Sequence, residues 1–99
     1  MVVYEVNLTL DKDVVDEFRG WLDAHIQEML TFPGFKHSKL MKVEEKSSWQ
    51  MTVWYFVETR SALEAYFQGE AARMREEGLA RFSGRFTASR RILEVLEER

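Results

Sequence analysis

The stretch WQMTVWYFVE, residues 49–58, is the most hydrophobic run of the sequence. Its apolar side chains fall on both faces of an extended chain, which is typical of a central strand that is covered on two sides. The stretch VVYEVNLTL, residues 2–10, instead alternates apolar and polar side chains and predicts a half-buried strand. Both runs therefore indicate a sheet.

Two stretches with apolar side chains at three- and four-residue spacing predict helices. The first covers residues 12–30, with Asp11 as its N-cap, and FPGF at residues 32–35 ends it. The second begins after Thr59 or Ser61 as its N-cap and ends at Gly78, which we expect to be its C-cap.

Two further strands complete the expected fold. FKHSKLMKVEE, residues 35–45, carries several lysines that suit an edge strand, and FTASRRILEVL, residues 86–96, supplies the last strand. The order is β-α-β-β-α-β, which predicts one ferredoxin-like α+β domain over residues 1–99. We expect a four-stranded antiparallel sheet with two helices on one face.

The apolar residues on both sides of the strand at residues 49–58 leave the second sheet face in need of a cover. A second copy of the chain, related by a two-fold axis, supplies that cover with the fewest assumptions. The sequence therefore predicts a homodimer that forms through the sheet faces.

Composition narrows the classes of function. The 99 residues carry a net charge of −3, which gives no general attraction for nucleic acid, and no cysteine. The first ten residues resemble neither a signal peptide nor a membrane span, so we expect a cytoplasmic protein. Two histidines in different elements, without cysteine, predict no metal site.

One basic stretch, GLARFSGRFTASRRIL at residues 78–93, contains four arginines and no acid. Because many acidic residues surround it in the sequence, we interpret its arginines first as partners in ion pairs and second as a site for a small anion. Nucleic-acid binding ranks third. In a strand, Arg90 and Arg91 point to opposite faces of the sheet.

The sequence resembles a family on the motifs YEVNLTLD, EMLTFPGF, TVWYFVETRSALEAYF and RMREEGLARFSGRFTASRRILE. It is similar to an uncharacterised domain-of-unknown-function family within the dimeric α/β-barrel superfamily. The resemblance implies a ferredoxin-like protomer and a dimer with facing sheets, and it implies no function.

The same superfamily includes antibiotic-biosynthesis and haem-degrading monooxygenases. The haem-degrading members carry an asparagine on the first strand, which Asn7 matches, and a histidine on the second helix, which this sequence lacks. We therefore expect no haem and no other cofactor.

Two residues stand out as candidate acids or bases. His25 follows Leu22 by three residues and precedes Met29 by four, so it is expected to face the sheet, either as a base or as a structural imidazole. Glu70 is expected in the middle of the apolar stripe of the second helix. There it is a cleft acid with a raised pKa, one half of a structural ion pair with an arginine of the 78–93 stretch, or a carboxylate that extends to solvent at the rim.

Two functions are consistent with these features. The first is a small-molecule binding or accessory module for an organic or anionic ligand, with a cleft between helices and sheet. The second is a cofactor-free monooxygenase or isomerase acting on an aromatic or polyketide-like substrate, with His25 as base. In that case we expect Asn7 with Arg81 or Arg85 to stabilise negative charge, and the cleft walls to be Trp54, Tyr66 and Phe67.

Overall fold

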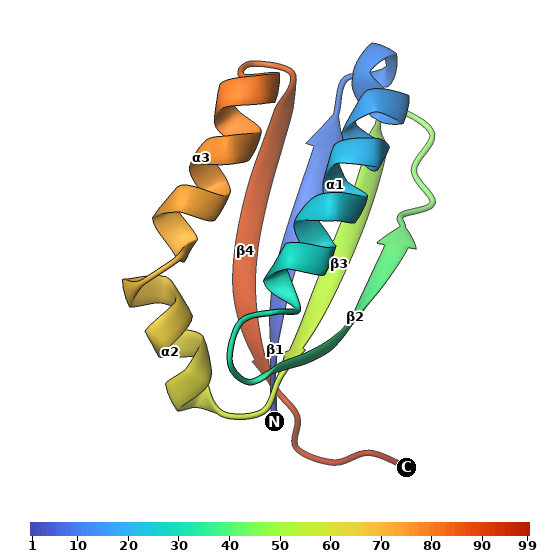
Figure 1. The fold of residues 1–99 in the computed structure, drawn as a ribbon. Coiled ribbons are helices and arrows are strands. Elements are labelled where there is room, and N and C mark those ends of the chain that lie inside the picture. The colour runs from blue at the N-terminus through green and yellow to red at the C-terminus, as the bar shows by residue number, and fades with distance from the viewer.

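A computed structural model describes residues 1–99 and confirms the ferredoxin-like arrangement (Figure 1). The four strands form an antiparallel sheet in the order β2-β3-β1-β4. The elements along the chain are β1 (Val2–Leu10), the 3-10 turn η1 (Lys12–Val14), α1 (Val15–Met29), β2 (Phe35–Lys42), β3 (Trp49–Val57), α2 (Arg60–Gln68), α3 (Ala71–Phe82) and β4 (Phe86–Glu94).

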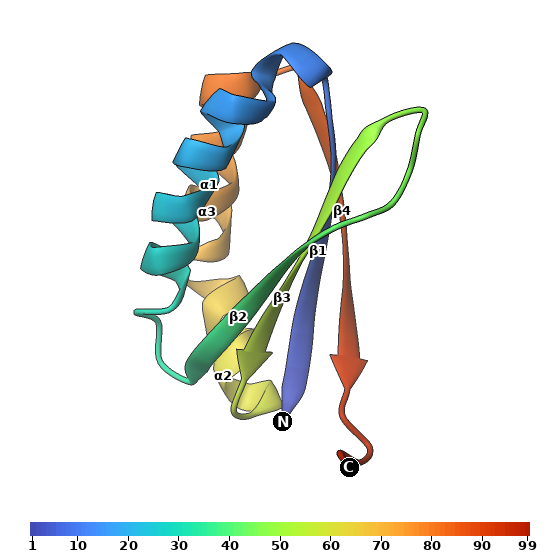
Figure 2. The ribbon, with the colours of Figure 1, turned by 90° about the vertical axis from the view of Figure 1, so that its right-hand side faces the viewer.

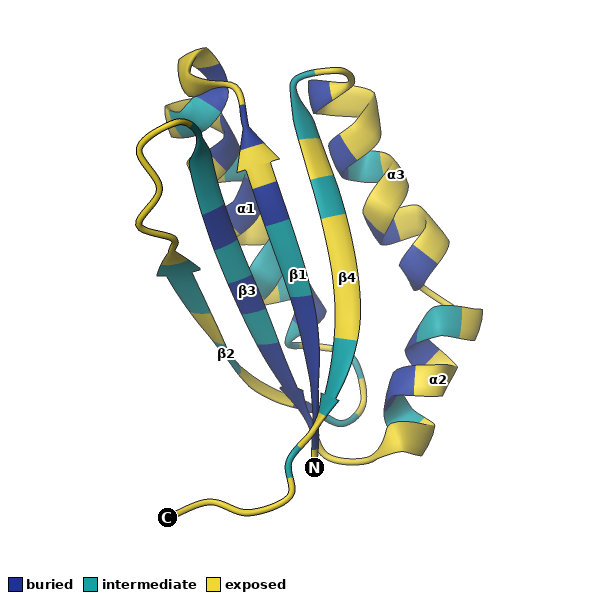
Figure 3. Cartoon of the chain, turned by 180° about the vertical axis from the view of Figure 1, so that it is seen from behind, coloured by how far each residue is buried: buried dark blue, intermediate teal, exposed yellow.

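All three α-helices cover the same face of the sheet, and the other face carries no element of the chain (Figure 2). The core lies between these two layers and includes the fully buried side chains of Phe18, Leu63 and Met74. Seen from behind, β1 and β3 are largely buried or half-buried, whereas β4 has only half-buried and exposed residues (Figure 3). None of the helices is long and apolar enough to cross a membrane.

Strand pairing fixes which side chains face the helices. Tyr4 on β1 lies opposite Tyr55 on β3, and the next residue, Glu5, lies opposite Trp54. Because successive side chains of a strand point to opposite faces, Tyr4 and Tyr55 face the helices while Glu5 and Trp54 face away. We call these two surfaces the helix face and the open face of the sheet.

The second predicted helix is two helices. The helix is interrupted at Gly69 and Glu70, where both backbone N–H groups donate to the carbonyl of Tyr66. The helix α3 then continues through Gly78 to Phe82, so the prediction of Gly78 as a C-cap is wrong. Gly78 instead allows a close approach, because a Cβ there would lie 3.0 Å from the indole ring of Trp21.

The remaining boundaries differ only at their ends. Residues 12–14 form a 3-10 turn ahead of α1, and the Asp11 side chain does not cap the helix. It accepts a hydrogen bond from Arg85 instead, at 2.8 Å. The predicted cap of the second helix is confirmed, since Thr59 Oγ1 accepts from the Ala62 N–H at 3.1 Å. Gly34 forms the turn before β2, with φ of +84°.

Candidate functional site

A cavity of about 50 Å³ lies between the helix face of the sheet and the helices α1 and α3. Twelve of its sixteen lining residues are hydrophobic. The polar groups that reach it come from His25, Arg75, Arg90 and the tyrosines. The complete lining is Tyr4, Val6, Leu8, Phe18, Trp21, Leu22, His25, Met29, Val53, Tyr55, Tyr66, Met74, Arg75, Gly78, Phe86 and Arg90.

His25 projects from α1 into this cavity, as its spacing predicts. Its ring stacks on Trp21 with the two centroids 4.6 Å apart, and its Nδ1 atom is buried without a hydrogen-bond partner. Burial lowers the pKa of the imidazole to about 4, and the positive charge of Arg90 adds to this while Glu28 opposes it. The imidazole is therefore neutral at pH 7, and one of its nitrogens is free to bond a guest.

Three tyrosines form an aromatic cluster beside His25. The ring centroid of Tyr4 lies 6.1 Å from that of Tyr55 and 5.9 Å from that of Tyr66. Burial raises the pKa of Tyr66 to about 12 and also raises the pKa of Tyr55. No side chain of the protein bonds the hydroxyl of Tyr55 or Tyr66. Both hydroxyls therefore remain neutral at physiological pH and available as donors.

Two arginines complete the polar lining. Arg75 comes from α3 and donates from Nη2 to the Tyr4 hydroxyl at 3.2 Å, which raises the pKa of its guanidinium. Arg90 comes from the helix face of β4 and lies near enough to His25 and Tyr66 to influence their titration. The two guanidiniums thus approach one cavity from two different elements.

Of the residues predicted for the cleft, His25 and Tyr66 lie in this cavity. The prediction that Asn7 and Trp54 share it is wrong, because both side chains lie on the open face of the sheet. The physical reason is strand alternation: Tyr4, Val6 and Leu8 occupy the helix face of β1, so an odd-numbered neighbour cannot.

On the open face Asn7 and Trp54 belong to a polar network around Glu5. The Glu5 carboxylate is only 3% exposed and accepts from Trp54 Nε1 at 2.9 Å and from Asn7 Nδ2 at 3.0 Å. Arg91 pairs with the same carboxylate. The hydrogen bond from Arg91 is the main cause that lowers the pKa of Glu5 to about 2, and Asn7 and Trp54 add to it.

Glu70 is at the surface rather than in an apolar stripe. Because the helix is interrupted at Gly69, the side chain of Glu70 does not point in the direction that one continuous helix predicts. Glu70 becomes the N-terminal flank of α3. It pairs with Arg73 at 2.9 Å, and Arg73 also bonds Glu28 and Glu77, each at 2.8 Å. The alternative of an ion pair with an arginine is therefore the one observed, although the arginine is not in the 78–93 stretch.

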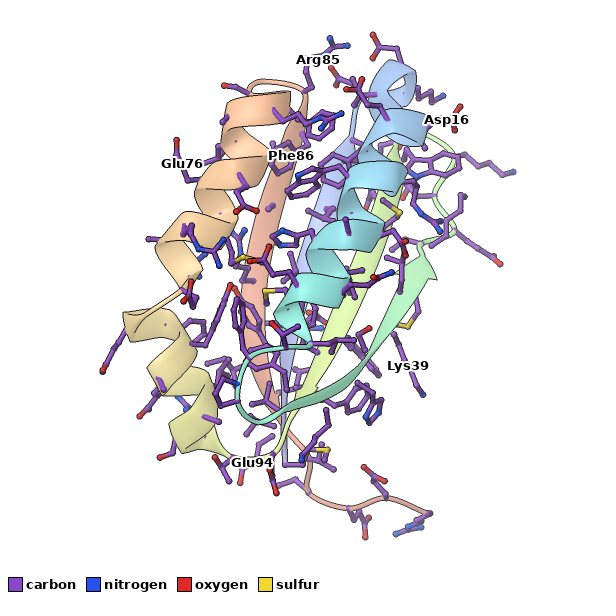
Figure 4. All side chains as sticks on the ribbon, in the orientation of Figure 1. Asp16, Lys39, Glu76, Arg85, Phe86 and Glu94 are labelled. Atoms are coloured by element: carbon purple, nitrogen blue, oxygen red, sulfur yellow. The ribbon has the colours of Figure 1, made fainter.

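The other three predicted ligand-binding residues also lie outside the cavity. Arg81 pairs with Glu17 at 3.3 Å, and Arg85 pairs with Asp11 and Asp13 at the turn that joins α3 to β4 (Figure 4). Phe67 packs edge-on against Tyr4 with centroids 5.3 Å apart, behind the cavity wall. Arg81 and Arg85 thus serve as the structural ion pairs that ranked first for the 78–93 stretch.

Sequence reasoning missed Arg75 as a cavity residue, although its helical phase is visible. Ala71, Met74 and Gly78 are buried on one face of α3, and Arg75 is four residues after the first and three before the last. For Arg90 the signal was strand alternation: Arg90 and Arg91 point to opposite faces, so one of them has to face the helices. No group of three or more His, Asp or Glu side chains lies close enough together to hold a metal ion.

The sequence matches the family described as Domain of unknown function (DUF4286) over residues 1–96, and the chain belongs to this family. None of the curated proteins matches it in sequence.

Solved structures share the fold at low sequence identity. A protein of Deinococcus radiodurans assigned to antibiotic biosynthesis monooxygenases matches with a TM-score of 0.78 and 12% identity, over 99% of this chain and 95% of that one. A mutant form of SnoaB from Streptomyces nogalater, a cofactor-independent oxygenase, gives 0.72 and 13%, over 98% and 95%. The haem-degrader MhuD from Mycobacterium tuberculosis, with two haems in its active site, gives 0.70 and 19%, over 99% and 98%.

Proposed function

We propose that this chain is a cytoplasmic, homodimeric protein that binds a small organic molecule in the cavity between α1, α3 and the sheet. The observation that carries the proposal is the buried, unpartnered Nδ1 of His25 inside an aromatic-lined cavity. Buried polar groups in proteins are almost always hydrogen-bonded, so a lone buried nitrogen indicates a partner that the chain itself does not supply. The hydroxyls of Tyr55 and Tyr66, which no side chain of the protein bonds, add two hydrogen-bonding groups to the same cavity.

The size of the cavity sets how a ligand enters. A volume of about 50 Å³ holds roughly three or four water molecules. A larger guest requires a wall to move, and Trp21 is the most suitable wall because it is only half-buried and rests on the backbone of α3 at Gly78. A flat aromatic or polyketide-like guest then replaces the contact between the indole and His25.

Haem does not fit this site. The single histidine in the cavity is His25 on α1, and its ring is stacked on Trp21 with Nδ1 buried. Neither α2 nor α3 carries a histidine that could bind iron. We therefore do not propose for this chain the haem binding that is named for MhuD.

The open face supports the homodimer. Trp54, Phe56 and Leu93 line an apolar groove there, beside the buried Glu5 network. An uncovered apolar sheet face is rare in a stable monomer, and a second copy placed by a two-fold axis covers it with a self-complementary surface. The dimer contact and the ligand cavity then lie on opposite sides of the sheet.

The binding proposal is tested with 2-naphthol as the probe, in calorimetric titrations of the wild-type chain and of Val6→Phe. Val6 is half-buried on the cavity wall, so the added ring occupies the cavity and is expected to weaken binding at least tenfold. The matched control is Leu79→Phe, which adds the same ring on the exposed side of α3, where Leu79 is 50% exposed. Binding that is equally weakened, or equally unaffected, in both variants contradicts the cavity as the site.

A cofactor-free monooxygenase or isomerase is the second candidate, and the unpartnered Nδ1 of His25 in an apolar cavity favours it. Burial lowers the pKa of this imidazole to about 4 and makes it a weak base, so its substrate needs an acidic carbon such as the CH₂ group of an aromatic ketone. Arg90 lines the same cavity and supplies positive charge for the resulting enolate. Return of the proton at another carbon is isomerisation. In oxygenation, the CH₂ carbon and O₂ give a C=O group and one water. The fold shared with the cofactor-independent oxygenase SnoaB supports this candidate.

The two functions are separated with anthrone as the probe substrate. Oxygen consumption and deuterium exchange at its CH₂ group are measured for wild type and His25→Gln. An enzyme accelerates one of these reactions and loses most of that rate in His25→Gln while keeping its fold. A pure binding protein accelerates neither, and an equal rate in both proteins contradicts a role for His25 as base.

A further inference from the structure

We infer that the ligand of the cavity is an aromatic carboxylate whose anionic group lies between the guanidiniums of Arg75 and Arg90, next to the Tyr4 hydroxyl. This inference rests on the proposed binding function and names the chemical class of its ligand. The observation that carries it is that these two arginines reach one cavity while neither has a carboxylate partner within 4 Å.

The pairing pattern of the arginines makes this arrangement unusual within the chain. Six of the nine arginines form ion pairs with acidic side chains, which leaves Arg19, Arg75 and Arg90 without one. Two of these three line the same cavity although they come from α3 and β4. A guanidinium is planar and matches a carboxylate with two parallel hydrogen bonds, so two that lack an acidic partner and line one cavity form a ready site for such a group.

No carboxylate lies within 4 Å of either guanidinium. The acid that affects the titration of His25 is Glu28, and Arg73 already binds its carboxylate at 2.8 Å. The imidazole of His25 and the hydroxyls of Tyr55 and Tyr66, which also line the cavity, are neutral at pH 7. The cavity opening therefore carries an uncompensated positive charge, which attracts an anion.

The lining selects an aromatic acid over an inorganic anion. Behind the two arginines the wall is made of aromatic and aliphatic side chains, among them Trp21 and Phe86. Apolar surface of this kind stabilises a ring and gives nothing to free phosphate or sulfate. The unpartnered Nδ1 of His25 lies deeper, where it can bond a phenol or ketone oxygen on the far side of the ring.

The test compares charged and neutral probes of one shape. Benzoate and 2-naphthoate are titrated calorimetrically against benzamide and 2-naphthamide, with inorganic phosphate as a competitor. Wild type is expected to bind each carboxylate at least about tenfold more tightly than its amide, because a charged hydrogen-bonded pair exceeds a neutral one by about that factor. Phosphate in millimolar excess is expected to compete poorly.

The variants are Arg75→Gln and Arg90→Gln, with Arg81→Gln as the matched control on α3, outside the cavity. Each cavity variant is expected to lose most of the preference for the carboxylate while its affinity for the amide stays within about twofold. The control keeps the preference. Both arginine side chains are exposed, so the fold is expected to survive, and thermal unfolding of each variant verifies this.

The outcomes separate this inference from the function on which it rests. Amides that bind as tightly as carboxylates leave the binding function in place and overturn the anionic class. A preference that survives in both cavity variants overturns the assignment of Arg75 and Arg90. Strong competition by phosphate shows that the site binds anions in general and overturns the assignment to aromatic acids. Failure of all four aromatic probes to bind contradicts the binding function itself.

Discussion

Replacement of Glu5 by glutamine is expected to destabilise the fold and to remove part of its sensitivity to acid. Glu5 is buried on the open face, and its carboxylate accepts hydrogen bonds from Trp54, Asn7 and Arg91. All of these partners are donors. A glutamine side chain of the same size presents an NH₂ group to at least one of them, so a donor faces a donor and a favourable charge pair is lost.

The magnitude follows from the pKa of Glu5, which falls from 4.5 to about 2 on folding. At 1.36 kcal/mol per pKa unit this corresponds to about 3 kcal/mol of stability. Because 68% of the Arg91 side chain is exposed, water screens the pair, and we expect about 1–3 kcal/mol. A carboxylate with a lowered pKa stabilises the folded state above pH 4.5, and this contribution is lost as the pH falls toward 2.

The assay is urea unfolding followed by circular dichroism, at one subunit concentration and one ionic strength, from pH 7 to pH 2.5. Wild type and Glu5→Gln are expected to differ by about 1–3 kcal/mol at pH 7 and to converge as the pH falls below about 4. The control Glu94→Gln removes an exposed carboxylate on β4 that forms no ion pair, and it should follow wild type. A constant difference across the whole range refutes the assignment to Glu5 ionisation.

Three further predictions concern the turn before β2, the cap of α2 and the cavity. Gly34→Ala should cost about 2–4 kcal/mol in urea unfolding, because φ is +84° and the new Cβ would lie 2.5 Å from the Ala62 Cβ; a neutral effect contradicts this turn geometry. Thr59→Ala should cost about 0.5–2 kcal/mol in the same assay through loss of the cap, whereas Thr59→Ser should restore most of it. The ring nitrogens of His25, followed by NMR and assigned by their loss in His25→Gln, should titrate near pH 4; titration near 6.5 contradicts a buried imidazole.

Elements with a clear periodicity could be predicted from the sequence, and so could the order of the fold. The strand at residues 2–10 has the predicted bounds because every second residue is apolar. Glu70 shows where this reasoning stops. A single interruption at Gly69 shifts the helical phase, and a side chain expected against the sheet becomes exposed and pairs with Arg73. The backbone hydrogen bonds around Gly69 determine where the helix is interrupted, and they cannot be inferred from the hydrophobic pattern of the sequence.

The candidate site could be predicted only in part, because a site combines side chains from several elements. The spacing around His25 placed it correctly on the sheet side of α1. The same alternation that places Tyr4 on the helix face excludes Asn7 from the cavity. The sequence alone therefore showed that Asn7 and Tyr4 lie on opposite faces of the sheet. The convergence of Arg75 with Arg90 depends on how α3 lies over β4, which neither segment reveals alone.

The most direct test of the cavity as the binding site is an NMR titration with 2-naphthoate that follows the three tryptophan indole N–H signals. Trp21 lines the cavity, whereas Trp54 donates to Glu5 on the open face of the sheet. We predict that the probe shifts the Trp21 signal and leaves the Trp54 signal unchanged. A shift of Trp54 without a shift of Trp21 would move the ligand to the open face and contradict the account.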